Sequence, residues 1–302
     1  MAARRGRAPG GRIVPLRQSL VKLDAHSFLG RMTGVLTNIE QRARGVALGI
    51  LDYFTLIARG VRFIFARPFY WNDAVTQMDR IGVGSLPIVL LTGLFTGMVL
   101  ALQSSVELSK FGADVYIGNL VGASMVRELG PVLCSLMVAG RAASGIAAEL
   151  GSMRVTEQID ALQSFGTDPI KKLVTPRLLA GILMLPLLTV VADIVGILGG
   201  MIVAVMRIGI TADSYLQGVL NTLAQSGFVL GIFPKDFVSG LLKPFVFGAI
   251  ITLTASFYGL NTRGGTEGVG LAATRSVVTC SVLILAMDYV LTQLLLVLLP
   301  PG

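Results

Sequence analysis

Residues 81–106 read IGVGSLPIVLLTGLFTGMVLALQSSV and carry no charged side chain. A helix needs about twenty mostly apolar residues to cross the hydrocarbon core of a bilayer, so this stretch predicts a membrane span. Four further stretches qualify with at most two charges each: Val115–Gly140, Leu178–Met206, Phe237–Leu260 and Ser276–Leu299. The sequence therefore predicts an all-α integral membrane protein with five transmembrane helices in a domain that covers residues 73–302.

The composition agrees with a membrane protein. Mean hydropathy is +0.76 and only 14% of the 302 residues are charged, while 36 glycines suit helices that pack closely in lipid. The net charge of +8 comes from basic residues near the N-terminus and at the ends of apolar runs. That distribution is typical of contact with a membrane surface, so we expect no nucleic-acid partner.

The sequence lacks the patterns of catalytic and metal sites. His26 is the sole histidine, and Cys134 and Cys280 lie inside apolar runs without the spacing of a zinc site or a disulfide framework. No GxxxxGK[ST] pattern is present to hold nucleotide phosphates. We expect a non-enzyme with no catalytic residue, no metal and no bound cofactor.

The loop charges predict the orientation in the membrane. With a cytoplasmic N-terminus, five crossings place the C-terminus on the opposite side of the membrane. The inside segments then hold the basic tail, Arg141, Arg154, Lys171, Lys172, Arg177, Arg263 and Arg275. The outside segments hold only Lys110, Arg207 and Lys235, which Asp114, Asp213 and Asp236 offset. This excess of positive charge inside is the usual one.

Two segments precede the first span. Residues 1–36 are basic and lack the apolar core of a secretory signal, which predicts a disordered tail, with an organellar transit peptide as the alternative. Residues 37–72 predict an amphipathic helix in the cytoplasmic interface, because Ile50, Ile57 and Val61 recur at helical spacing. A sixth span is the alternative, but it would bury several arginines.

The loop between the second and third predicted spans is the most informative soluble segment. Residues 144–165 predict a helix too charged to span, and Glu149, Met153, Glu157 and Asp160 share one face of it. Asp168-Pro169 and Thr175-Pro176 predict two further helix starts, the first opening a short basic helix. Spacing alone leaves a solvated connector and a docking element for another protein equally open.

Four charged residues are predicted to lie at membrane depth, where charge is costly. Arg127 and Glu128 interrupt the second span together, and Pro131 frees a backbone carbonyl one turn earlier. Adjacent helix residues point about 100° apart, so each is expected to meet a partner on another helix or a polar ligand. Asp193 and Asp288 are lone carboxylates for which protonation or a bond to a neighbouring helix is the simpler explanation.

An ordered series of motifs resembles the MlaE (YrbE) family of lipid-transport ABC permeases. The matching runs are Val126–Val132 (VRELGPV), Ala139–Ser144 (AGRAAS), Ala148–Gln158 (AELGSMRVTEQ), Asp168-Pro169, Gly97–Leu100 with Leu102-Gln103, Leu185–Thr189, Gly268–Gly270 and Ala273–Val278. The resemblance extends from about Ile81 to Leu295.

The resemblance implies a set of partners. Family members work as homodimers that bind two copies of a cytoplasmic ATPase, which holds the ATP and magnesium. They also bind a periplasmic MCE-domain protein and often a small STAS-domain subunit. Together these proteins move phospholipid between the inner membrane and the periplasmic carrier.

The resemblance also implies site residues. The AELGSMRVTEQ run corresponds to the coupling helix that sits in the ATPase, which favours docking and indicates Glu149, Met153, Arg154, Glu157, Gln158 and, on the same face, Asp160. The family's R-E-L-G-P motif borders the lipid cavity at the dimer axis. This indicates a lipid site formed by Arg127, Glu128, Leu129, Leu100, Leu108 and Phe111, where Phe111 stands in place of a tyrosine found in relatives.

We therefore expect a phospholipid permease in which Arg127 offers a bidentate guanidinium to the lipid phosphate. Three alternatives stay open. One keeps the fold but imports sterols or other hydrophobic molecules, one is an ion-coupled carrier that uses Glu128, Asp193 and Asp288, and one is a membrane anchor for a periplasmic lipid-binding protein.

Overall fold

The computed structural model describes residues 44, 47–64, 66, 70–225, 227–229 and 233–298. The predicted tail at 1–36 and His26 lie outside this part of the chain. The chain divides into two units, Met1–Phe54 and Thr55–Gly302. Within the described part of the first unit, residues 47–54 are helical. The second unit holds the predicted spans.

The second unit is almost entirely helical. After helical residues 55–64 its α-helices are α2 (Trp71–Ile81), α3 (Leu86–Leu108), α4 (Ile117–Ser124), α5 (Gly130–Val138), α6 (Ser144–Val155), α7 (Gln158–Ser164), α8 (Thr175–Val203), α9 (Ala212–Gln225), α10 (Lys235–Leu260) and α11 (Gly265–Leu298). Short 3₁₀ turns cover Val83–Ser85, Ser109–Phe111 and Asp114–Tyr116. Wider π-helical turns cover Met125–Leu129, Ala139–Ala143, Ile170–Val174 and Ala204–Ile208. Strands β1 (Phe228–Val229) and β2 (Phe233–Pro234) form one two-residue antiparallel pair.

The prediction of five spanning helices is confirmed. Five helical stretches of the described chain are long and apolar enough to cross a membrane: Trp71–Phe111, Asp114–Val155, Ile170–Ile208, Lys235–Leu260 and Gly265–Leu298. Each contains one predicted span. Residues 47–64 are not among them, which favours five spans over six.

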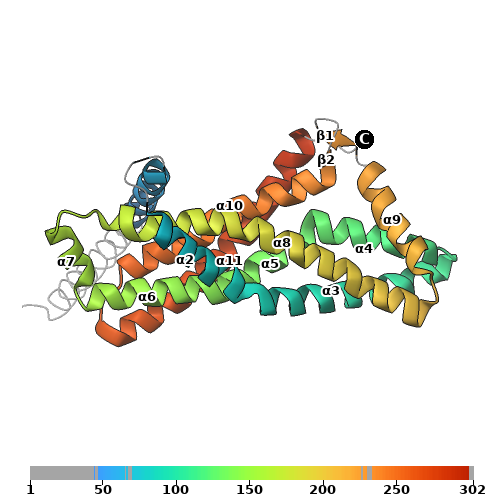
Figure 1. Ribbon diagram of the computed structural model, residues 1–302, viewed down its shortest axis with the longest axis horizontal. Coiled ribbons are helices and arrows are strands. Elements are labelled where there is room, and N and C mark those ends of the chain that lie inside the picture. Colours follow the sequence, from blue (N-terminus) through green and yellow to red (C-terminus); the bar gives the residue numbers. More distant parts are fainter. Residues whose placement is uncertain are drawn as a thin grey trace, which may run out of the picture. The chain divides into compact units, whose positions relative to one another are not determined.

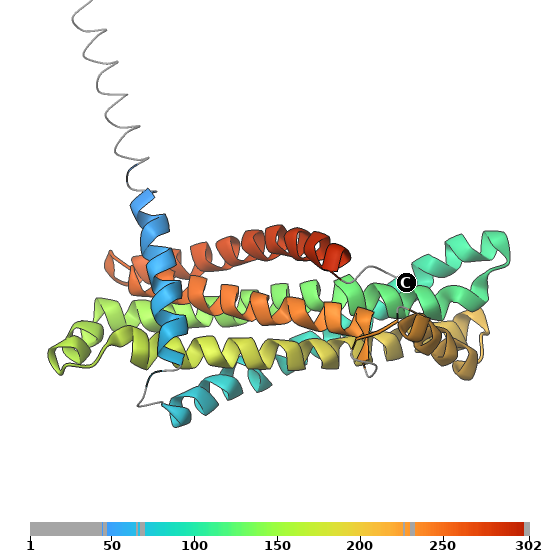
Figure 2. The same ribbon diagram turned by 90° about the horizontal axis from the view of Figure 1, so that it is seen from above.

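The long helices of the second unit lie side by side (Figures 1 and 2). In Figure 2, α11 lies on one side, α10 and α5–α6 lie next to it, and α8 separates these from α2. Figure 1 places α7 at one end of the helices, and the turns that join α3 to α4 and α8 to α9 at the other. Successive spans therefore run in opposite directions, as short connections require.

Small residues allow α3 and α8 to make the most extensive helix contact of the described chain. Gly93 and Gly97 of α3 face Ala192 and Gly196 of α8, each pair spaced by four residues. A Cβ added at Gly97 would lie 1.8 Å from the carbonyl oxygen of Gly196. Helices in lipid associate through this kind of close backbone approach, because the hydrophobic effect does not distinguish helix from lipid there.

A reciprocal glycine contact joins α8 to α10. An added Cβ at Gly181 would lie 2.7 Å from the carbonyl oxygen of Gly248, and one at Gly248 would lie 2.2 Å from that of Gly181. Two neighbouring helix pairs are therefore set by backbone contacts, and α8 lies at the centre of both.

The segment before the first span differs from its prediction. It was expected to be one interfacial helix over 37–72, whereas Trp71–Ile81 forms a separate helix, α2, that the periodicity missed. Leu56, which the predicted apolar face left out, is 5% exposed and packs with Val174, Leu178 and Leu253. Val61, on the predicted face, is exposed, and its location in a membrane interface stays a prediction.

The helix predicted over 144–165 is wrong as a single element. It is divided into α6 and α7 at Glu157, which has φ of 60°, a left-handed conformation that is uncommon outside glycine. α6 continues the second span instead of starting a separate helix. The four residues predicted to share one helix face therefore lie on two helices. The basic helix at Lys171 and Lys172 also continues, as a π-helical turn, directly into α8.

We predict that Gly97→Ala destabilises the protein, because the new methyl group would force α3 away from α8. Overpacking of this kind costs about 1–3 kcal/mol. The measurement is the apparent melting temperature of the detergent-purified protein. Gly270→Ala is the matched control, because a Cβ there meets nothing within 4 Å. A Gly97→Ala variant as stable as the control would show that the α3–α8 contact tolerates separation.

Candidate functional site

The second span carries its two central charges on a π-helical turn. Arg127 and Glu128 belong to the turn Met125–Leu129, which ends directly before Gly130-Pro131. Proline has no amide proton, so Pro131 cannot donate a hydrogen bond to the carbonyl group of Arg127. Lys243 of α10 supplies the replacement, since its Nζ donates to that oxygen over 3.1 Å. The backbone group freed by Pro131 is thus satisfied by a buried cation.

A glycine brings α10 close enough for this contact. A Cβ added at Gly240 would lie 2.0 Å from the carbonyl oxygen of Val126, so only glycine allows this approach without displacement. Asp236 and Lys243 lie one turn before and one turn after Gly240. The same close approach therefore places an acid opposite Arg127 and a base opposite Glu128.

Two ion pairs join these helices, and a third reaches α11. The Arg127 Nη2 lies 2.5 Å from Asp236 Oδ2, and Lys243 Nζ lies 2.5 Å from Glu128 Oε2. Lys243 Nζ also lies 3.1 Å from Asp288 Oδ1 of α11. We call the five residues Arg127, Glu128, Asp236, Lys243 and Asp288 the charged cluster. Thr292 of α11 adds a hydrogen bond to Glu128, donating its hydroxyl over 3.3 Å.

The charged cluster has a buried side and an open side. The Lys243 side chain is 2% exposed, whereas those of Arg127 and Glu128 are 42% and 44% exposed. Arg127 uses one terminal guanidinium nitrogen for Asp236, and its Nε is buried, so the exposed part of the side chain is the rest of the guanidinium group. Arg127 can therefore accept a further ligand on the open side, while Lys243 cannot.

The sequence located three of the five residues of this cluster. Arg127 and Glu128 were expected to meet partners on another helix, and both do. Asp288 is not a lone carboxylate, because Lys243 pairs with it. Lys243 and Asp236 were missed as members. The available signal was their spacing of seven residues, two helical turns, which puts both on one face of the fourth span.

Asp193 is separate from the cluster. It lies against Gly130, where an added Cβ would be 1.6 Å from its Oδ1, and this oxygen has no hydrogen-bond partner in the part of the chain that the structure describes. The predicted bond from Asp193 to a neighbouring helix is not seen at this oxygen.

The apolar residues of the predicted lipid site are only partly brought together. Leu100, Leu108 and Leu129 pack around one buried group that includes Ile117 and Met125. Phe111 lies in the turn after α3 and is 81% exposed, outside this group. Three of the four apolar candidates therefore share a wall, and Phe111 does not contribute to it within this chain.

The predicted coupling residues divide into two sets. Glu149 pairs with Arg80 of α2 at 3.0 Å and with Arg177 of α8 at 2.9 Å, and Met153 packs against the main apolar core. Arg154 pairs with Asp160 across the α6–α7 junction. Glu157, Gln158 and Asp160 are exposed, as is Phe165 at 84%. The exposed set is available to a partner, while Glu149, 39% exposed, is engaged by two arginines and its coupling role stays a prediction.

Comparison with known proteins identifies the family of this chain. The family described as permease MlaE matches residues 74–294. A probable ABC transporter permease protein of Rickettsia prowazekii is 42% identical over 248 residues, which cover 82% of this chain and 92% of the relative. An intermembrane phospholipid transport system permease protein, MlaE of Haemophilus influenzae, is 36% identical over 258 residues, 82% of this chain and 96% of the relative.

A plant relative shares the same region. The Arabidopsis thaliana chloroplastic protein trigalactosyldiacylglycerol 1 is 38% identical over 224 residues, which cover 74% of this chain and 61% of that protein. The family match includes α3 to α10, the charged cluster and the α6–α7 junction. This chain is a membrane permease that belongs to the MlaE family.

Proposed function

We propose that this chain is the permease subunit of an ABC transporter that moves phospholipid between the bacterial inner membrane and a periplasmic MCE-protein carrier. Membership of the MlaE family supports the proposal, as does the similarity to a relative described as a phospholipid transport permease. The observation that carries it is the charged cluster, in which the half-exposed Arg127 lies two residues before Leu129 of the apolar wall.

Arg127 is the proposed contact for the lipid phosphate. A guanidinium has five N–H donors in a planar fork that matches phosphate oxygens, and the hydrogen bond to Asp236 uses few of them. Charge-assisted hydrogen bonds of this kind are about twice as strong as neutral ones. A sterol offers no such anion, so the exposed guanidinium of Arg127 favours phospholipid over the sterol alternative.

The remaining cluster residues hold the site together. Lys243 is enclosed by Glu128, Asp288 and the Arg127 carbonyl, so it acts as a positioning residue. The contacts of Glu128 join it to Lys243 and Thr292, so its proposed role is to link helices rather than to orient Arg127. Leu100, Leu108 and Leu129 then form the apolar wall for acyl chains, and Phe111 would contribute only from the rim.

ATP hydrolysis is proposed to be done by a separate cytoplasmic subunit that docks on the α6–α7 junction. The exposed set Glu157, Gln158, Asp160 and Phe165 offers carboxylates around one aromatic side chain. Aromatic anchors with a polar rim are typical of protein interfaces. Glu149 supports the junction from inside through its two arginines.

The assembly completes the proposal. Two copies of the chain enclose the cavity, the MCE-domain protein covers its periplasmic end, and a STAS-domain subunit accompanies the ATPase. The N-terminus is cytoplasmic and the C-terminus periplasmic, in agreement with the basic residues at the α7 end of the spans.

We predict that Arg127→Gln lowers lipid transfer about tenfold or more, because the neutral amide cannot replace a charged donor fork. Transfer of labelled phospholipid from proteoliposomes containing the complete transporter to the MCE protein is the measurement. Arg207→Gln, at the far end of the third span, is the control. Normal transfer by an Arg127→Gln transporter that assembles would rule out the phosphate contact.

We predict that Lys243→Met destabilises the protein because it leaves Glu128 and Asp288 without a cation. Breaking a buried ion pair from one side costs about 3–5 kcal/mol. The triple variant Lys243→Met, Glu128→Gln, Asp288→Asn should recover most of the melting temperature, since no buried charge is then unpaired. If the triple variant is no more stable than Lys243→Met alone, unpaired charges are not the cause of the destabilisation and the prediction is wrong.

We predict that Glu157→Gly uncouples the ATPase without harming the fold. Glycine adopts the left-handed conformation at no steric cost, so the backbone is kept while the carboxylate is removed. The measurements are the amount of ATPase that co-purifies and its lipid-stimulated rate. Glu107→Gly, at the opposite end of the spans, is the control for charge. Unchanged co-purification and stimulation would exclude a contact through Glu157.

A further inference from the structure

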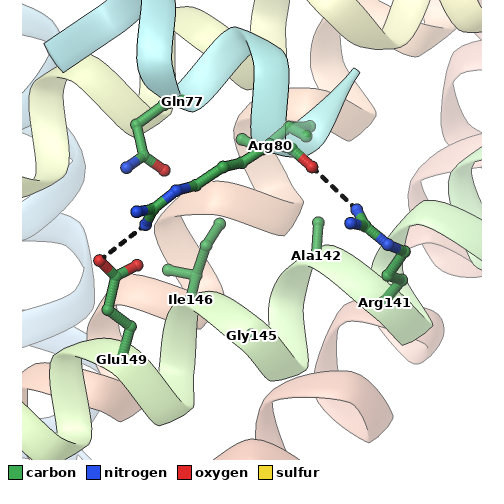
Figure 3. A pocket seen from close by; sticks show the side chains of 8 residues that line it. Gln77, Arg80, Arg141, Ala142, Gly145, Ile146 and Glu149 are labelled. Carbon is green, nitrogen blue, oxygen red and sulfur yellow. Dashed lines mark hydrogen bonds and ion pairs between the residues drawn. The ribbon is translucent and has the colours of Figure 1, made fainter. Parts of the chain in front are cut away.

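A pocket lies far from the charged cluster, between α2 and α6 (Figure 3). It has a volume of about 460 Å³. Its lining consists of Gln77, Arg80, Ile81, Arg141, Ala142, Gly145, Ile146 and Glu149. Arg127 and Arg141 are fourteen positions apart on one helical span, which is about 21 Å at 1.5 Å per residue. The pocket is therefore distinct from the proposed transport site.

The pocket lies at the level where the apolar part of the spans ends. Arg80 is the last charged residue before the first apolar stretch, and Arg141 is the first after the second one. The hydrocarbon core excludes such charges, whereas the headgroup layer accepts them. The pocket opening therefore faces the polar part of one leaflet, at the α7 end of the spans.

Arg141 is held in a fixed position but is not neutralised. Its Nη1 donates to the Arg80 carbonyl over 2.8 Å and to the Ser85 hydroxyl over 3.2 Å. Its guanidinium lies against Gly84, where an added Cβ would be 2.2 Å from Nη2. Within the described residues no carboxylate forms an ion pair with it. A preorganised, uncompensated guanidinium is a strong anion donor.

The charges around the pocket leave a positive excess. The lining carries two arginines, Arg80 and Arg141, and one carboxylate, that of Glu149, which Arg80 shares with Arg177 outside the lining. Two positive charges against one negative charge leave one positive. Figure 3 shows Arg80 and Gln77 at one end of the pocket and Arg141 at the other, with Ala142, Gly145 and Ile146 between them. Ala142 and Ile146 are buried, so the floor is small and apolar.

We propose that this pocket binds the headgroup of an anionic phospholipid from the adjacent leaflet. The phosphate lies on Arg141, the polar remainder of the headgroup lies toward Gln77 and Arg80, and the first carbons of the lipid lie on the apolar floor. The inference goes beyond the proposed function, because it concerns a lipid that resides at the helix junction and holds for any transported cargo. Glu149 of α6 connects the pocket to α8 through Arg177. A lipid bound there would therefore contact the helix that leads to the α6–α7 junction.

Binding of lipid to the purified full-length chain tests the proposal by native mass spectrometry. All variants carry Arg127→Gln, so that the proposed transport site does not contribute to lipid binding. The result for the pocket is then independent of whether Arg127 contacts lipid. Dioleoyl phosphatidylglycerol is compared with dioleoyl phosphatidylcholine, which has the same acyl chains. We expect phosphatidylglycerol to bind about tenfold more tightly, because both lipids carry the phosphate but the choline cation of phosphatidylcholine would be repelled by Arg80 and Arg141.

Two variants should remove this preference. Arg141→Gln removes the anion donor, and Gly145→Leu fills the floor without a clash, since a Cβ there meets nothing within 4 Å. The matched controls should keep the preference. Arg275→Gln removes an exposed arginine beside Ser276, which bonds to Ala143 at the same level, and Gly140→Leu adds the same side chain outside the pocket.

The possible outcomes decide the proposal. Loss in Arg141→Gln and Gly145→Leu with retention in both controls supports it. Retained preference in a folded Arg141→Gln variant, or equal loss in the controls, overturns it. If Arg141→Gln does not fold, Arg141→Lys and Gly145→Leu decide, since the lysine should keep most of the preference. Displacement of phosphatidylglycerol by inorganic phosphate at similar concentration would overturn a lipid as the occupant and identify a free phosphate instead.

Discussion

Lys243 carries a positive charge into the middle of the spanning helices, where an unpaired ion would cost several kcal/mol. It meets Glu128 of the second span, Asp288 of the fifth span and the carbonyl oxygen of Arg127. Each contact requires the others, because removal of any one leaves a charge or a lone pair unsatisfied. The relative positions of three spans thus depend on one ammonium group.

This arrangement depends on one proline and one glycine that change how the helix backbones meet. Pro131 leaves the Arg127 carbonyl without its helical donor, and Gly240 lets α10 approach the π-helical turn that carries Arg127. The missing amide proton of Pro131 and the missing side chain of Gly240 together create the site that Lys243 occupies. One proline and one glycine therefore determine where the polar groups of the membrane domain meet.

The fold was largely predictable from the sequence, but the site only in part. Runs such as Ile81–Val106 are too long and too apolar to be exposed to water, so the number and positions of the spans could be predicted from hydropathy. Lys243 was visible as the sole charge of its span, yet nothing local indicates that Asp288, 45 positions later, is its partner. The break at Glu157 was unpredictable because glutamate favours helix and rarely adopts the left-handed conformation that it has here.

The contacts between spans differ in whether they can adjust when the helices move relative to one another. At Gly93, Gly97, Gly196 and Gly248 backbone meets backbone, with no side chain that could change rotamer. Such a contact is either kept or lost, so α3, α8 and α10 are expected to travel together as one rigid body. The contacts of α11 with Lys243 and Glu128 are made by side chains that can lengthen or exchange partners. Any alternation between open and closed cavities should therefore be sought in the displacement of α11 against the other three.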